Sequence, residues 1–172
     1  MKKVVILIAD EHHDLEVWYP LLRFKEAGWT VITAGIDSKK SYQGKFGYPI
    51  TVDTHIDEIK SQDFDAIIIP GGWAPDYIRR SQLAIELVSE MFRSGKIVSA
   101  ICHGGWVLAS ANILKGKSVT SVSAIKDDLI NAGALWLDKE VVVDENLVTS
   151  RKPDDLPYFC KAILAMGEKI KH

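Results

Sequence analysis

The stretch Lys96-Ile-Val-Ser-Ala-Ile-Cys-His-Gly-Gly-Trp-Val-Leu-Ala-Ser110 organises the rest of the chain. Its apolar run from Ile97 to Ile101 follows a glycine and predicts a buried strand. The apolar-rich segment 106–113 predicts a helix, which places Cys102 at the strand-to-helix turn. This arrangement is typical of a nucleophile elbow, with Cys where hydrolases often carry Ser.

The residues around Cys102 favour a reactive thiol. Ala100, Gly104 and Gly105 are small, as a crowded turn requires, and the turn pushes one side chain out above the sheet. The N-terminus of the following helix carries partial positive charge, so we expect the pKa of the Cys102 thiol to be lowered. His103 is a candidate base or charge partner. The alternative is a structural Cys buried on a strand.

Length and composition indicate one globular domain, 1–172. The chain contains 47% hydrophobic and 26% charged residues, and its formal net charge of −2 predicts no binding to nucleic acid or anionic membrane. No apolar run approaches the roughly 18 residues of a membrane span, and Asp10 interrupts the first one. Two distant cysteines, Cys102 and Cys160, fit a reducing cytoplasm rather than a disulfide framework. Cys160 is predicted to be a core residue.

Outside the elbow, predicted strands alternate with predicted helices. Strands are expected at 3–9, 30–36, 64–69, 97–101 and 118–121, with antiparallel excursions at 42–52 and at 139–143 with 147–149. Helices are expected at 15–27, at 75–94 with a break near Ser81, at 106–113, at 123–133 and from Pro153 onward. Leu15, Trp18, Leu22 and Phe24 are the expected apolar stripe of the first helix, and Ser123 is the expected N-cap of its own helix.

This alternation predicts an α/β fold: a flavodoxin-like, doubly wound, mostly parallel sheet with helices on both faces. Sites in such sheets lie beyond the C-terminal ends of the strands. Three loops meet that rule, and each carries reactive groups or glycines: 10–16, 70–76 and 102–105.

The loop after the strand 64–69 begins Pro70-Gly71-Gly72. Paired glycines allow backbone N–H groups to approach a ligand closely. We expect the Gly72 and His103 amides to form an oxyanion hole for a tetrahedral intermediate. An ordinary turn is the alternative.

The first loop carries several acids beside His12 and His13. Adjacent histidines rarely converge on one ion and no His pair at i, i+4 exists, so we expect no metal and a solvated polar loop. Glu16 differs because its apolar neighbours Leu15 and Val17 indicate that it points toward the top of the sheet. A buried carboxyl there has a raised pKa, can hydrogen-bond to the Cys102 thiolate while protonated, and can pass a proton to and from substrate.

The chain resembles the ThiJ/PfpI superfamily, the cysteine branch of the class I glutamine amidotransferase-like fold, and most closely its PfpI type. The resemblance covers nearly the whole chain and rests on these stretches: Glu16-Val-Trp-Tyr-Pro20, Gly44-Lys-Phe-Gly-Tyr48, Phe64-Asp-Ala-Ile-Ile-Ile-Pro-Gly-Gly72, Ala74-Pro-Asp76, Ala100-Ile-Cys-His-Gly104, Asp127-Asp-Leu-Ile-Asn-Ala-Gly133, Val141-Val-Val-Asp144 and Thr149-Ser-Arg151.

The resemblance implies that Cys102 is the nucleophile, that His103 is its neighbour and that the Glu16 carboxyl touches the sulfur. It also implies a homo-oligomer, a dimer or a hexamer, in which an adjoining subunit donates Asp76 to His103. Two positions depart from the pattern: Phe46, where the closest relatives often have His, and His13, where some have Glu.

The resemblance further implies a cytoplasmic, cofactor-free enzyme, and two activities are open. One acts on methylglyoxal, glyoxal or their early adducts on proteins and nucleotides, without metal or glutathione; the other is an intracellular cysteine peptidase. We favour the first, because a short chain with few loops above the sheet has little room for an extended peptide. The non-enzymatic alternative is a redox-sensing or chaperone-like stress protein in which Cys102 is oxidised.

The segment Trp73-Ala-Pro-Asp-Tyr-Ile78 is apolar and aromatic around one acid. Such clusters, when exposed, mark interfaces, which agrees with the implied position of Asp76. The alternatives are a loop packed on its own domain and an Asp76 that only caps its helix. His55 and His172 have no companions in the sequence and are expected at the surface.

Overall fold

The computed structural model describes residues 1–169, so the expected surface residue His172 and the last part of the predicted domain lie outside the described chain. A seven-stranded sheet forms its centre. In spatial order the strands are β10 (Val141–Asp144), β11 (Leu147–Ser150), β7 (Ile97–Ile101), β6 (Ala66–Ile69), β1 (Lys3–Ile8), β2 (Thr30–Gly35) and β5 (Thr54–His55).

Every neighbouring pair in this sheet is parallel except β10 with β11. Numbered along the chain, the five central strands β1, β2, β6, β7 and β11 have the spatial order 2-1-3-4-5, which is the flavodoxin-like order. The predicted fold class is therefore confirmed, including the hairpin at the edge. Glu145, in the turn of that hairpin, has a positive φ of 54°.

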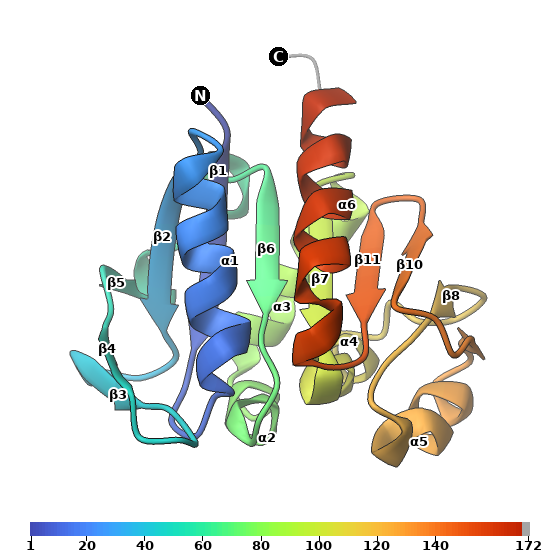
Figure 1. Ribbon diagram of the computed structural model, residues 1–172. Coiled ribbons are helices and arrows are strands. Elements are labelled where there is room, and N and C mark those ends of the chain that lie inside the picture. Colours follow the sequence, from blue (N-terminus) through green and yellow to red (C-terminus); the bar gives the residue numbers. More distant parts are fainter. Residues whose placement is uncertain (170–172) are drawn as a thin grey trace.

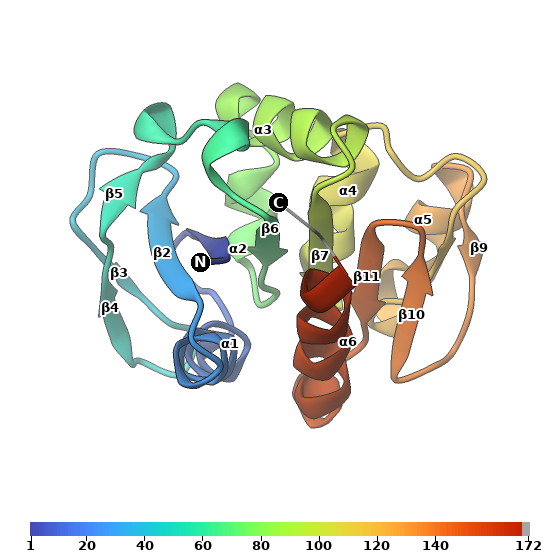
Figure 2. The same ribbon diagram turned by 90° about the horizontal axis from the view of Figure 1, so that it is seen from above.

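Helices cover both faces of the sheet (Figures 1 and 2). One face carries α1 (Asp14–Glu26) and α6 (Leu156–Lys169), and the other carries α3 (Gln82–Arg93) and α4 (Gly105–Ser110). Two shorter helices, α2 (Ala74–Ile78) and α5 (Lys126–Asn131), lie near the C-terminal ends of the strands. The short helices of the 3-10 type are Ile56–Glu58, Ser61–Asp63, Cys102–Gly104, Ser123–Ile125 and Pro153–Asp155.

Two hydrophobic cores follow from the alternation of side chains along each strand. In β1, Val5 and Leu7 face the core beneath α3 and α4, whereas Val4 and Ile6 face the core beneath α1 and α6. Strands buried on both faces read as continuous apolar runs, which explains why they were visible in the sequence. Cys160 belongs to the second core and is 1% exposed, as predicted.

Two small sheets lie outside the central one. The antiparallel pair β3 (Ser41–Gln43) and β4 (Pro49–Thr51) is the excursion predicted at 42–52. A parallel pair, β8 (Ser118–Val119) with β9 (Leu135–Trp136), was only partly foreseen, since no strand was predicted at 135–136. Among residues 1–169, no helix is long and apolar enough to cross a membrane.

Two local predictions need correction, the apolar stripe of α1 and the N-cap at Ser123. Leu15 and Leu22 are exposed, because the sheet covers the opposite stripe of α1, formed by Val17, Leu21 and Phe24. Ser123 does not cap its helix: it begins a 3-10 turn, and α5 starts only at Lys126.

The predicted break near Ser81 is present, and Ser81 caps α3 by accepting a hydrogen bond from the Ala84 amide at 3.3 Å.

Candidate active site

The elbow at Cys102 has the geometry that the sequence predicted. Cys102 directly follows β7 and has a φ of 60°, in the left-handed region that non-glycine residues seldom adopt. The small residue at 104 is required, because a Cβ there would lie 2.7 Å from the Ile69 carbonyl oxygen and 3.2 Å from the Ala100 Cβ. The chain therefore holds Cys102 in a strained conformation at the C-terminal edge of the sheet.

Glu16 reaches the sulfur from the first turn of α1. Its side chain is fully buried, and one carboxyl oxygen accepts a hydrogen bond from the Gly71 amide at 2.7 Å. A Cβ at Gly71 would lie 2.5 Å from that oxygen and 2.7 Å from the Cys102 Cβ, so only glycine fits. Burial raises the pKa of Glu16 to about 7, although the Gly71 hydrogen bond and a hydrogen bond with Cys102 oppose the shift. Near neutral pH this carboxyl is therefore able to accept or donate a proton.

The pKa of the Cys102 thiol differs from the sequence-based expectation. Burial, followed by the nearby Glu16 carboxylate, raises it to about 12, whereas a lowered value was predicted. The prediction was wrong because a 3-10 turn separates the sulfur from α4, which begins only at Gly105, and because the closest ionisable carboxyl repels a thiolate. The backbone amides of Gly72 and His103 donate hydrogen bonds to the sulfur and act in the opposite direction. The resting thiol is thus protonated, and a base must receive its proton during attack.

His103 is the second group in reach of that proton. Its Nδ1 lies 3.4 Å from the Cys102 Sγ. Its ring packs against two indoles that also stack on each other, with centroid distances of 5.8 Å to Trp73 and 5.2 Å to Trp106. Burial, then the charge of Lys45, lowers the pKa of His103, so the imidazole is neutral at neutral pH.

The first loop is less solvated than predicted. His12 is fully buried, and its Nδ1 lies 2.9 Å from the Ala9 carbonyl oxygen. The buried carboxylate of Asp14 accepts backbone hydrogen bonds of 2.9 Å from both Phe46 and Tyr48. Asp14 thereby fastens the segment 44–48 beside the elbow. Within residues 1–169, no group of three or more His, Cys, Asp or Glu side chains is arranged to hold a metal ion.

Sequence reasoning missed the role of Lys45 and the contact between Phe46 and His13, the two positions that depart from the family pattern. The charge of Lys45 lowers the pKa of Glu16, His13 and His103, which places its ammonium near all three groups. Phe46 is 70% exposed, and its ring meets the His13 ring edge-on at 5.1 Å. Gly44 and Gly47, on either side of Lys45 and Phe46, indicated a tight loop. Nothing in the sequence indicated which strand end this loop would reach.

Asp76 lies in the first turn of α2, where its described partner is the Arg80 guanidinium four residues on. Among the contacts of residues 1–169, none joins Asp76 to His103. The predicted exposed cluster is only partly correct: Trp73 and Tyr77 are exposed at 48% and 40%, whereas Ala74, Pro75 and Ile78 are buried. Of the two exposed rings, Trp73 packs against His103 and Tyr77 lies beside the Arg80 guanidinium.

The structure thus gathers Cys102, His103, Glu16 and the Gly72 amide at the C-terminal ends of β1, β6 and β7, where α1, α2 and α4 begin (Figure 1). A buried carboxyl above a cysteine elbow on a flavodoxin-like sheet defines a class of proteins. The chain belongs to this class, the DJ-1/PfpI family, whose model matches residues 2–166.

Individual relatives support that assignment. The chain is 49% identical to Deglycase TK1284 of Thermococcus kodakarensis over 154 aligned residues. The aligned region covers 90% of this chain and 92% of that protein. It is 44% identical over 167 residues to Protein/nucleic acid deglycase 2 of Escherichia coli, covering 96% and 97% of the two chains.

A solved two-domain structure from Anabaena variabilis, with DJ-1/ThiJ/PfpI-like and ferritin-like domains, matches 96% of this chain with a TM-score of 0.94 and 42% identity. The present chain spans 48% of that longer protein. The family resemblance predicted from the sequence is confirmed.

Proposed function

We propose that this protein is a cysteine-dependent enzyme of the PfpI type that acts on reactive carbonyls such as methylglyoxal, or on their early adducts. The observation that carries the proposal is the buried pair of Glu16 and Cys102. A carboxyl with a pKa of about 7 lies against a protonated thiol, beside backbone amides. The deglycase names of the relatives agree with this chemistry.

The pair supplies a mechanism. Glu16 takes the thiol proton as the Cys102 Sγ bonds to the aldehyde carbon, and the Gly72 and His103 amides face the carbonyl oxygen. Glu16 then returns this proton to that oxygen, which completes the hemithioacetal and leaves Glu16 free to act as a base again. Glu16 next moves a proton from the former aldehyde carbon to the adjacent carbon while the hydroxyl proton passes to the ketone oxygen, which converts the adduct into a lactoyl thioester. Water hydrolyses the thioester and restores the thiol. In sum, methylglyoxal and water give lactate and a proton.

Two observations bear on the choice of substrate. The name of the Escherichia coli relative includes nucleic acid, yet the net charge of −2 here supplies no attraction for a phosphate backbone. The short connections above the sheet agree with a small substrate rather than an extended peptide, so intracellular peptidase activity is the second candidate. A redox-sensing or chaperone-like stress protein is the third.

Lactate production tests these candidates. Wild type should release lactate from methylglyoxal without added metal or glutathione, and Cys102→Ser should not. Cleavage of a fluorogenic peptide with no lactate would favour the peptidase, and a chaperone effect that survives Cys102→Ser would favour the stress protein.

We further propose that the active site is shared between subunits of a dimer or hexamer, with Asp76 orienting His103 of a neighbour. Trp73 and Tyr77, exposed on either side of Asp76, provide an aromatic surface suited to such an interface. Asp76→Ala should lower turnover with little change in thermal stability.

Asp127→Ala is the matched control, since Asp127 is another exposed acid in the first turn of a short helix. Light scattering should find at least a dimer. A fully active monomer, or an Asp76→Ala variant that loses stability but keeps turnover, would refute the shared site.

A further inference from the structure

A second cavity lies one strand away from the elbow. It has a volume of about 280 Å³, and its walls come from the segment after β8, from the end of β9 with the residues that follow it, and from the segment after β11. The last residue of β11, Ser150, is paired in register with Ile101, which directly precedes Cys102. Adjacent strands are about 4.8 Å apart, so the lining residues Arg151 and Lys152, which follow Ser150, leave the sheet beside the turn that carries Cys102. It lies on the β11 side of β7, opposite the Glu16 and Gly71 side.

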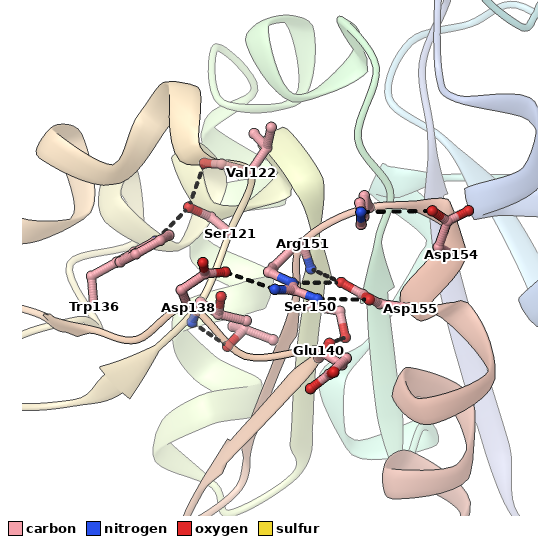
Figure 3. Close-up of polar contacts among 12 residues, drawn as sticks. Ser121, Val122, Trp136, Asp138, Glu140, Ser150, Arg151, Asp154 and Asp155 are labelled. Atoms are coloured by element: carbon pink, nitrogen blue, oxygen red, sulfur yellow. Dashed lines mark hydrogen bonds and ion pairs between the residues drawn. The ribbon is translucent and has the colours of Figure 1, made fainter.

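A fixed frame surrounds this cavity (Figure 3). The Arg151 guanidinium donates to the buried Asp155 at 2.9 and 3.2 Å and to Asp138 at 2.7 Å. On the opposite wall, the Trp136 indole N–H donates to the Ser121 hydroxyl at 3.0 Å. These bonds hold the walls in place without a ligand, as binding sites that are largely pre-formed require.

Charges of opposite sign remain available on this frame. Asp138 uses one carboxylate oxygen for Arg151, and its side chain is 70% exposed. The Lys152 ammonium lies 3.6 Å from Asp154, and its side chain is 55% exposed. Both residues line the cavity together with the apolar surfaces of Trp136 and Val122. A group that carries a carboxylate and an ammonium on a short apolar stem matches this combination.

We propose that this cavity binds the amino-acid portion of a glycated substrate, with Asp138 facing its ammonium and Lys152 facing its carboxylate. The reactive carbonyl then lies over Cys102 while the part of the substrate that departs as an amine extends toward β11. This assignment rests on the proposed function for the identity of the substrate, but the cavity and its charges do not depend on it. Free lysine is the product of such a reaction and serves as the probe.

Equilibrium dialysis with radiolabelled L-lysine tests the site without any turnover. Wild type should bind lysine at least about tenfold more tightly than 1,5-diaminopentane, which has the stem and both amines but no carboxylate. Lys152→Gln and Asp138→Asn should each weaken lysine binding about five- to tenfold, as the loss of one charged contact predicts. Lys115→Gln, in a different cavity at the far end of the sheet, is the control and should bind as wild type does.

Methylglyoxal turnover provides the second readout. Because methylglyoxal has neither an ammonium nor a carboxylate for Asp138 and Lys152 to contact, both cavity variants should keep kcat/KM for it within about twofold of wild type. Equal binding of lysine and 1,5-diaminopentane, or unchanged lysine binding in both variants, would overturn the inference and leave a purely structural frame, even if methylglyoxal is turned over. Selective lysine binding without turnover of methylglyoxal would uphold the cavity and overturn the proposed activity.

Discussion

Cys102 and Cys160 have thiols with similarly raised pKa values, but their surroundings differ. Burial is the largest cause that raises the pKa of each thiol to about 12. Cys160 is 1% exposed on α6 and packs among apolar side chains of the second core. Cys102 has a strained backbone, a carboxyl and an imidazole in reach, and two amides directed at its sulfur. The resting pKa of a thiol therefore does not separate a nucleophile from a core residue; the groups that receive its proton do.

Replacing each cysteine by alanine in turn should give the largest effect. Cys102→Ala removes the nucleophile, so turnover should fall by roughly 10³-fold or more while the protein stays folded. Cys160→Ala leaves a small cavity in the core, so it should cost about 1 kcal/mol of stability and leave turnover within about twofold. Lactate assays and urea unfolding of both variants check this reversal. Comparable losses of turnover in the two variants would contradict it.

Glu16→Gln tests the proton acceptor. Glutamine keeps the shape of the side chain and the hydrogen bond from Gly71 but cannot take the thiol proton, so turnover should fall by roughly 10²-fold. The measurement is kcat under saturating methylglyoxal, with circular dichroism as the check on folding. Unchanged turnover would leave Glu16 with a packing role and move the proton transfer to His103.

The difference between the two cysteines was only partly predictable. The strand 97–101 and the small residues after it specify the elbow locally, since turn geometry depends on neighbours in sequence. The position of Glu16 was also foreseen, because parallel strands end at one edge of the sheet. The thiol pKa was not, because it depends on where α4 begins and on which charge lies nearest the sulfur, and both are tertiary properties.

Segments brought in from a distance were the least predictable. Asp14 was expected in a solvated loop, yet it is buried and binds the backbone of a segment about thirty residues away. Lys45 acquires its proximity to Glu16 through that attachment and through the hydrogen bond of 2.8 Å that its own amide donates to the His12 carbonyl oxygen. The arrangement of α1 was ambiguous for a related reason, because two apolar stripes had helical spacing and only packing decided which was covered.

The pH dependence of the free energy of unfolding should also distinguish the Glu16–Cys102 site from the core around Cys160. The folded pKa of Glu16, about 7, is raised above its ordinary 4.5. The stability that its protonated form contributes is therefore fully present below pH 4.5 and is lost as pH rises through 7. The loss amounts to about 3 kcal/mol by pH 8.

Urea unfolding of wild type and Glu16→Gln between pH 4.5 and 8 measures this loss as the difference between two curves. Other titrating groups cancel in that difference. Cys160→Ala is the control, and its difference from wild type should be flat over the same range. A flat difference for Glu16→Gln would show that the carboxyl titrates normally.

Alkylation by iodoacetamide should give the smallest effect and the sharpest distinction. At pH 6 both thiols should react slowly, since burial keeps both protonated. At pH 8.5 Cys102 should react roughly tenfold faster than Cys160, because Cys160 becomes accessible only through local unfolding.

In Glu16→Gln the carboxylate that repels the thiolate is gone, so the pKa of Cys102 should fall and its alkylation should become faster. Turnover and alkylation would then change in opposite directions in one variant, which is the expected behaviour if Glu16 both suppresses the resting thiolate and receives its proton during reaction. Mass spectrometry of the two labelled peptides measures both rates, and Cys160 is the internal reference. Slower labelling of Cys102 in Glu16→Gln would mean that the carboxyl promotes the thiolate at rest.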